Sequence, residues 1–170
     1  KSPFVPVQRF SREIKSSHQV SVPVPEFSLR GKGIIQPTLW ESEPGIVHML
    51  LRSTEGCIFR SDSRDDGQTW CMAYATGLPN NNSGIDLTTL EHGEVVLVYN
   101  PVGENWGKRT PLVINISQDN GNTWEDEFIL EDGEGEYSYP AIVARGNDIY
   151  LTYTWNRERI AFWKILIETD

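Results

Sequence analysis

Hydrophobic residues in this chain occur in short runs rich in β-branched and aromatic side chains. Glycine, proline, asparagine or aspartate bounds each run, and none of the repeated segments has the 3.6-residue period of an amphipathic helix. Such runs between turn-forming residues are typical of β-strands. The pattern therefore predicts an all-β fold.

The runs repeat in a fixed order of strand, turn, strand, loop and strand. This order occurs three times, starting at Ile35, Gly84 and Tyr139. Self-similarity over roughly 20 to 50 residues indicates a solenoid or a propeller. The predicted strands are 35–40, 46–52 and 57–61 in the first copy, 84–90, 95–100 and 111–116 in the second, and 139–144, 149–154 and 160–165 in the third.

An eight-residue motif follows the third strand of the first two copies. The segments 63–70 and 117–124 both read Ser-x-Asp-x-Gly-x-Thr-Trp, one repeat apart. The glycine can take a positive φ in a tight turn, and the Ser and Asp side chains can bind nearby backbone amides. We therefore expect two hairpins with a structural role, and we do not read Asp65 and Asp119 as an acid pair.

The repeats predict β-propeller blades of four antiparallel strands, about three blades in all, which is half of a six-bladed propeller. Residues 33–170 would form the three blades. Residues 1–32, punctuated by four prolines, would form a connecting segment or the end of a preceding blade. Three blades leave sheet edges uncovered, so we expect further blades from the same protein, from a homodimer or from another chain.

Composition narrows the range of partners. The chain has 15 Lys and Arg against 24 Asp and Glu, a net charge of −9. This argues against nucleic acid and anionic membrane surfaces, which need a basic stripe. The chain has no apolar run of about 18 residues, the length that would predict membrane insertion, and its first residues lack the pattern of a signal peptide. An anionic ligand would need a local arginine cluster.

Two cysteines, Cys57 and Cys71, flank the first motif. They could form a disulfide across a hairpin or remain half-buried free thiols. Neither has a metal-ligand partner at useful spacing, and the spacing of Asp132 and Asp148 does not support a calcium site. We predict no metal and no other cofactor.

The repeat alignment places candidate chemistry at one mouth of the central channel. Arg52 and Asn100 stand at equal distances after the turn glycines of their copies, and Thr154 ends the matching strand of the third. Equivalent strand ends of a propeller approach the same mouth. Arg109 opens a strand after the loop 101–108 and could project from the same rim. Two guanidinium groups converging there would suit a carboxylate.

These features together resemble the sialidase superfamily, specifically its bacterial-neuraminidase-repeat, or Asp-box, members. The resemblance covers residues from about 33 to 168 and matches the C-terminal half of the family's domain. It implies that Arg52 and Arg109 are two of three arginines that hold a sugar carboxylate, and that Tyr137 in Glu136-Tyr137-Ser138 is the nucleophile. The first arginine and the acid/base aspartate would lie in blades outside this chain. The family resemblance favours an extracellular or periplasmic location.

Two positions depart from the family pattern. Gln36 stands about where a glutamate would polarise the tyrosine, the nearest acid being Glu41, and Thr154 stands where many sialidases have a glutamate. A tyrosine without a neighbouring carboxylate is mostly protonated at neutral pH. Further candidate substrate contacts are Asn82, Asp86, Asn100, Trp155 and Arg157, with Asn156 beside them.

Two hypotheses follow for the function. The first is a sialidase-like exo-glycosidase half-domain that acts on a terminal, acidic sugar of a glycan. The second is a non-catalytic propeller that binds glycan or protein, or a structural subunit of a larger assembly.

Overall fold

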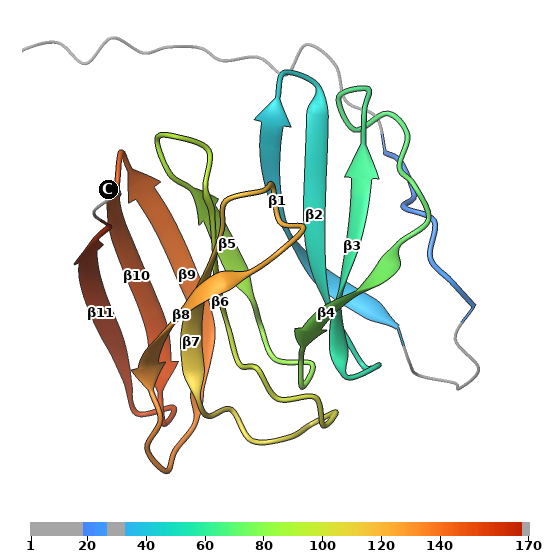
Figure 1. The fold of residues 1–170 in the computed structure, drawn as a ribbon. Helices are drawn as coiled ribbons and strands as arrows, with labels where there is room; N and C mark the ends of the chain where they lie inside the picture. Colours follow the sequence, from blue (N-terminus) through green and yellow to red (C-terminus); the bar gives the residue numbers. More distant parts are fainter. Residues whose placement is uncertain (1–18, 27–32, 168–170) are drawn as a thin grey trace, which may run out of the picture.

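The computed structural model describes residues 19–26 and 33–167, and these residues form strands, turns and loops without a helix. Three antiparallel sheets follow one another along the chain (Figure 1). Blade 1 has the order β1-β2-β3-β4, blade 2 the order β5-β6-β7-β8, and blade 3 the order β9-β10-β11. The predicted all-β propeller architecture is confirmed, with two four-stranded blades and a third that has three strands in the described part of the chain.

The strand bounds agree closely with the hydrophobic runs. Blade 1 consists of β1 (Ile34–Glu43), β2 (Ile46–Ser53), β3 (Cys57–Ser63) and β4 (Tyr74–Pro79). Blade 2 consists of β5 (Asp86–Thr89), β6 (Val95–Tyr99), β7 (Leu112–Ser117) and β8 (Glu125–Glu131). Blade 3 consists of β9 (Tyr137–Arg145), β10 (Asp148–Trp155) and β11 (Arg159–Leu166).

The core lies between the blades. One buried cluster, which includes Leu50, Ile58 and Leu97, joins blade 1 to blade 2. A second, which includes Val98 and Leu151, joins blade 2 to blade 3. Because β6 is buried along its whole length, its residues alternate between these two clusters.

Asp86 joins the first strands of all three blades. Its Oδ1 accepts a hydrogen bond from Thr38 Oγ1 on β1 (2.8 Å), and its Oδ2 accepts one from the Ile142 N–H on β9 (3.0 Å). A carboxylate is suited to this position because it offers two acceptor oxygens in one plane. Both oxygens of this predicted substrate contact are therefore engaged between blades.

Asn100 has a similar linking role in the structure. Its side chain is fully buried; Nδ2 donates to the carbonyls of Pro111 (2.8 Å) and Tyr137 (3.2 Å), while Oδ1 accepts from Ser83 Oγ (2.8 Å). The expectation that Asn100 lines the open mouth is not met, because these bonds hold its amide inside the joint between blades 2 and 3.

Both eight-residue motifs close hairpins between the third and fourth strands of their blades. In the second, Ser117 Oγ accepts the Gly121 N–H (2.8 Å), and Asp119 accepts the Thr123 amide and hydroxyl, each at 2.7 Å. Gly121 has a φ of 75°, a conformation that glycine adopts at little cost. The first motif repeats these bonds with Ser63, Asp65, Gly67 and Thr69. The motif bonds are local and structural.

The second hairpin also docks on blade 1. Asn120 accepts a hydrogen bond from Trp40 Nε1 at its Oδ1 (2.6 Å) and from Arg60 Nη1 at its carbonyl (2.8 Å), and its Nδ2 lies 3.1 Å from His48 Nε2. The loop of one blade is thereby fixed to the strands of the preceding blade.

The hairpin carboxylates predict an acid-sensitive stability. The backbone and hydroxyl bonds from Thr123, with those of Ser117 and Asn122, lower the pKa of Asp119 to about 2, although desolvation opposes them. A free Asp has a pKa of about 3.9, so the stabilisation is fully present above that value and is lost as the pH falls toward about 2. We expect the urea concentration at the midpoint of unfolding to fall less between pH 5 and pH 3 in Asp119→Asn than in the parent protein. Glu134→Gln, on an exposed loop, is the control, and equal losses in Asp119→Asn and the parent would contradict the prediction.

Residues 19–26 are the part of the predicted segment 1–32 that the structure describes. Residues 19–26 form no strand; the Pro23 carbonyl accepts the Ala73 N–H (2.9 Å), and Val22 packs against a small cluster that contains Met49 and Phe59. The other residues of the predicted connecting segment lie outside the described part of the chain. Cys57 and Cys71 are both free thiols, and burial raises the pKa of Cys57. None of the described residues forms a helix that is long and apolar enough to cross a membrane.

Candidate functional site

Two β-bulges lie near the starts of β1 and β9. The register of β1 shifts between Ile35 and Pro37, and that of β9 shifts opposite Thr152 and Thr154. Gln36 and Tyr139 lie in these bulges with φ of 50° and 54°. Side chains other than glycine seldom adopt this conformation, and it persists where the surrounding structure imposes it. The bulges reorient both side chains relative to the regular pleat.

Gly84 lets these two side chains come close to one another. It precedes β5, between the first strands of blades 1 and 3. A Cβ atom at Gly84 would lie 3.3 Å from Tyr139 Cδ1 and 3.6 Å from Gln36 Nε2. The missing side chain therefore leaves room for Gln36 and Tyr139 to flank the same backbone segment.

Arginines surround the phenol of Tyr139, which is about half exposed. The guanidinium carbon of Arg109 lies 5.0 Å from the centre of its ring. Hydrogen bonding from Arg109 and its positive charge, together with the charges of Arg52 and Arg157, lower the pKa of Tyr139, although desolvation opposes them. The site therefore favours a negative charge on this phenol, in a protein whose net charge is −9.

Glu136 positions two of these arginines. Its carboxylate lies 3.1 Å from Arg109 Nη1, and it accepts hydrogen bonds from Arg157 Nε at 3.0 and 3.1 Å. Desolvation would raise the pKa of Glu136, but the Arg157 hydrogen bond and the charges of Arg109 and Arg157 lower it overall. Asn156 fixes the Glu136 backbone, because the two residues exchange bonds of 2.7 and 2.8 Å.

Arg52 is held from the blade 1 side. Its Nη1 donates to the Asn82 carbonyl (3.1 Å), whereas its Nε is buried without a hydrogen-bond partner. Desolvation and the nearby charge of Arg109 lower its pKa, against the effect of Tyr139. Arg52 thus lies near enough to Arg109 and Tyr139 for their charges to act on its guanidinium.

Tyr137 lies elsewhere. Its side chain is only 4% exposed, it belongs to the cluster between blades 2 and 3, and its ring packs against Tyr153 and Trp155 at 6.4 and 6.5 Å. Desolvation and the charges of Glu131 and Asp132 raise its pKa. The structure brings Tyr139, and not the sequence-predicted Tyr137, into the arginine cluster. The repeat alignment held a signal for this, because Tyr139-Pro140 matches Gln36-Pro37.

Two other predicted contacts are mainly packing residues. Thr154 is half-buried and pairs with Ser138 across the sheet. Trp155 is half-buried against the blade 2 and 3 cluster, with the Arg159 guanidinium 4.6 Å from its ring centre. In the described ranges, no group of three His, Cys, Asp or Glu side chains is arranged to hold a metal ion.

A second polar cluster lies at the joint between blades 1 and 2. Ser42 Oγ lies 2.8 Å from His48 Nε2, and His48 Nδ1 lies 2.5 Å from Asp62 Oδ1. This order is that of a serine hydrolase triad, but Asn120 Nδ2 shares His48 Nε2 at 3.1 Å and Arg60 Nε donates to Asp62 at 2.9 Å. This row of hydrogen-bonded side chains therefore holds the hairpin of residues 117–124 on blade 1.

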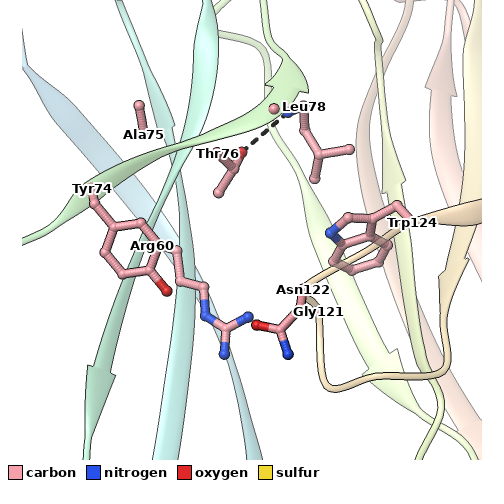
Figure 2. A pocket seen from close by; sticks show the side chains of 9 residues that line it. Arg60, Tyr74, Ala75, Thr76, Leu78, Gly121, Asn122 and Trp124 are labelled. Carbon is pink, nitrogen blue, oxygen red and sulfur yellow. Dashed lines mark hydrogen bonds between the residues drawn. The ribbon is translucent and has the colours of Figure 1, made fainter.

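In the pocket beside this polar cluster, the guanidinium group of Arg60 is already hydrogen-bonded to other residues. Figure 2 shows Arg60 and Asn122 facing each other between Tyr74 and Trp124, in a pocket of about 420 Å³. Arg60 uses Nε for Asp62, Nη1 for the Asn120 carbonyl and Nη2 for His48. A ligand here would have to compete with these bonds, so the arginine cluster at the mouth is the stronger candidate site.

The fold and this mouth define a three-bladed portion of a sialidase-like β-propeller. The family model of the BNR repeat-like domain matches residues 5–151, so the chain belongs to that family. The comparison with curated proteins found no match.

Solved structures of carbohydrate-active enzymes share the fold. The K499G mutant of NanB sialidase from Streptococcus pneumoniae is 18% identical with a TM-score of 0.61, over 76% of this chain and 21% of its own. The leech intramolecular trans-sialidase with 2,7-anhydro-Neu5Ac is 19% identical with a TM-score of 0.59, over 84% and 25%. The Penicillium chrysogenum α-L-arabinanase with arabinobiose is 17% identical with a TM-score of 0.53, over 74% and 42%. The chain thus spans less than half the length of each of these proteins, and the likeness concerns the fold.

Proposed function

We propose that this chain forms part of a sialidase-like glycoside hydrolase that acts on a terminal acidic sugar of a glycan. The observation that carries the proposal is that Arg109 lies over the ring of Tyr139 and shares the Glu136 carboxylate with Arg157, while the charge of Arg52 also acts on the Tyr139 phenol. Guanidinium groups bind carboxylates through paired hydrogen bonds. Their concentration at one mouth of an acidic protein supports a ligand that carries a carboxylate.

Tyr139 is the proposed nucleophile, in place of Tyr137. A neutral phenol can approach an acidic sugar without the repulsion that a carboxylate nucleophile would meet. Because Tyr139 is half exposed, it would give its proton to solvent as Oη attacks, and the nearby arginines would stabilise the negative charge that develops on the oxygen. Tyr139 Oη would form a bond to the anomeric carbon as the bond to the leaving oxygen breaks. A general acid from blades outside this chain would protonate that oxygen, and water would then release the sugar.

Further blades are part of the proposal. Blade 3 leaves Val143, Ile160 and Phe162 each more than 60% exposed, on strands at both edges of its sheet. Apolar side chains on a sheet face usually pack against another layer. We infer that an additional sheet, from the same protein or a partner, covers this face and completes the mouth.

The alternative function is glycan binding without turnover. Gln36 favours it, because a neutral amide beside Tyr139 cannot accept the phenolic proton as a carboxylate would. In that case the arginine cluster would still bind an acidic sugar.

Binding of acidic monosaccharides tests what the two functions share. We expect Arg109→Gln to weaken the binding of a sialic acid or uronic acid about 10- to 100-fold in calorimetric titrations, because one charge-assisted bond is lost. Arg159→Gln is the matched control, since its guanidinium lies over Trp155 and pairs with Glu158. Equal affinity in parent and Arg109→Gln for every acidic sugar tried would overturn the proposal.

A further inference from the structure

The segment 80–83, which joins blade 1 to blade 2, consists of four polar residues that the fold buries almost completely. Asn80 and Ser83 are 0% and 1% exposed, and Asn81 and Asn82 are 3% and 6% exposed. Polar side chains are costly to bury unless they form hydrogen bonds. The bonds that this segment makes therefore show what it holds in place.

Two asparagines of the segment form the same kind of local turn. Asn80 Oδ1 accepts the Asn82 N–H (2.9 Å), and Asn81 Oδ1 accepts the Ser83 N–H (3.1 Å). Each is an Asx-turn, in which the side chain bonds the amide two residues later. The two side chains differ in their nitrogens, because Asn80 Nδ2 stays within the segment, 3.4 Å from the Ser83 carbonyl, whereas Asn81 Nδ2 bonds another loop.

Asn81 is bonded to the end of the loop 101–108. Its Nδ2 donates to the carbonyls of Lys108 (2.6 Å) and Gly107 (3.3 Å). Its own carbonyl accepts the Trp106 N–H (3.1 Å). A single buried residue thus holds three successive residues of the loop.

Arg109 follows this loop directly, and its backbone is held on both sides. The Lys108 carbonyl, which precedes it, bonds Asn81, and the Arg109 carbonyl accepts the Tyr137 N–H at 2.9 Å. The guanidinium of Arg109 lies over the ring of Tyr139. The position of this cation over the phenol therefore depends on the bond from Asn81.

The residue after Asn81 holds the other arginine. The Asn82 carbonyl accepts the hydrogen bond from Arg52 Nη1 at 3.1 Å. Guanidinium groups that lie near enough to act on each other repel, so other groups have to keep them in place. Two adjacent residues, Asn81 and Asn82, bond the backbone before Arg109 and the side chain of Arg52.

We propose that Asn81 is a positioning residue for the arginine cluster. It holds the end of the loop 101–108 against the segment 80–83, and it thereby keeps Arg109 over Tyr139 and fixes Arg109 relative to Arg52. The consequence for binding an acidic sugar rests on the proposed function. The effect on Tyr139 rests on these contacts alone.

Ionisation of Tyr139 reports the position of Arg109 without any ligand. Hydrogen bonding and charge from Arg109 lower the pKa of Tyr139, so release of the loop end should raise that pKa. Asn81→Ser should therefore shift the pKa in the same direction as Arg109→Gln. A serine hydroxyl can accept the Ser83 N–H, but it is too short to bond the Lys108 carbonyl. NMR of isotope-labelled tyrosine in the intact protein measures the pKa, with Tyr139→Phe to assign the signal.

Asn80→Ser is the matched control. It shortens the neighbouring side chain by the same amount and keeps the same kind of turn, in a residue whose side-chain bonds to Asn82 and Ser83 stay within the segment. Asn81→Asp and Asn80→Asp repeat the comparison at the parental side-chain volume, because aspartate keeps the acceptor and loses the amide donors. A pKa of Tyr139 that equals the parent value in both Asn81 variants overturns the proposal. An equal rise in the Asn80 and Asn81 variants also overturns it, since the cause would then be a general loosening of the segment.

Binding separates this inference from the proposed function. In calorimetric titrations with sialic acid or a uronic acid, Asn81→Ser should weaken binding about tenfold and Asn80→Ser should leave it unchanged. A parent protein that binds no acidic sugar counts against the proposed function, whereas a shifted pKa of Tyr139 in Asn81→Ser would still support the positioning role. Unchanged binding in Asn81→Ser together with a shifted pKa would overturn the extension of that role to the acidic sugar.

Discussion

Replacing Asp86 with alanine should lower the free energy of unfolding by about 3 kcal/mol. The substitution removes charge-assisted hydrogen bonds from Thr38 Oγ1 and the Ile142 N–H, and it leaves both donors without that acceptor. These bonds join β1 and β9 through β5, so their loss weakens both joints between blades. Urea unfolding followed by tryptophan fluorescence measures the effect.

A double-mutant cycle isolates the link between blades 1 and 2. Thr38→Val alone should cost less than Asp86→Ala, and the double variant should cost less than the sum, because both changes remove the same bond. Asp132→Ala, on an exposed loop, is a control for loss of a carboxylate. A loss below about 1 kcal/mol for Asp86→Ala would show that the carboxylate is not a significant link between blades.

The second large effect concerns turnover. If the proposed hydrolysis is correct, Tyr139→Phe should reduce turnover of an acidic glycoside by on the order of 10³-fold or more, because the nucleophile is lost. Tyr137→Phe is the matched control and should stay within about threefold of the parent, since its ring keeps its packing against Tyr153 and Trp155. Fluorogenic glycosides of sialic and uronic acids measure both variants.

Ionisation of the phenol gives an independent readout. Arg109 lowers the pKa of Tyr139, so Arg109→Gln should raise that pKa. If turnover depends on the phenolate, the increase of the rate with pH should then shift to a higher pH. Large losses in Tyr137→Phe with none in Tyr139→Phe would restore the sequence-based choice of nucleophile. An intact protein that binds the acidic sugar but hydrolyses none of the panel would support the glycan-binding alternative.

Much of the fold was predictable because its signals are local. The hydrophobic runs of blades 1 and 2 are bounded by turns such as Glu43-Pro44-Gly45, and the strands end there in the structure. The motif hairpins were predictable for the same reason, since Ser117, Asp119 and Thr123 bond to one another within seven residues.

The site was only partly predictable. The family resemblance favoured Tyr137 in Glu136-Tyr137-Ser138, yet a bulge in β9 places Tyr139 beside Arg109 and leaves Tyr137 in the core. Asp86 and Asn100 occupy strand-end positions typical of ligand contacts, but Asp86 bonds residues of blades 1 and 3, and the buried amide of Asn100 bonds Tyr137 of blade 3 together with Ser83 and Pro111.

The sequence by itself therefore determined the class of fold and the two hairpins, because these depend on periodicity and on turn chemistry within a few residues. Only the tertiary structure decided which tyrosine lies beside Arg109 and which carboxylate joins the blades. The physical reason is distance along the chain: Asp86 meets partners 48 and 56 residues away, and such contacts depend on how the sheets pack.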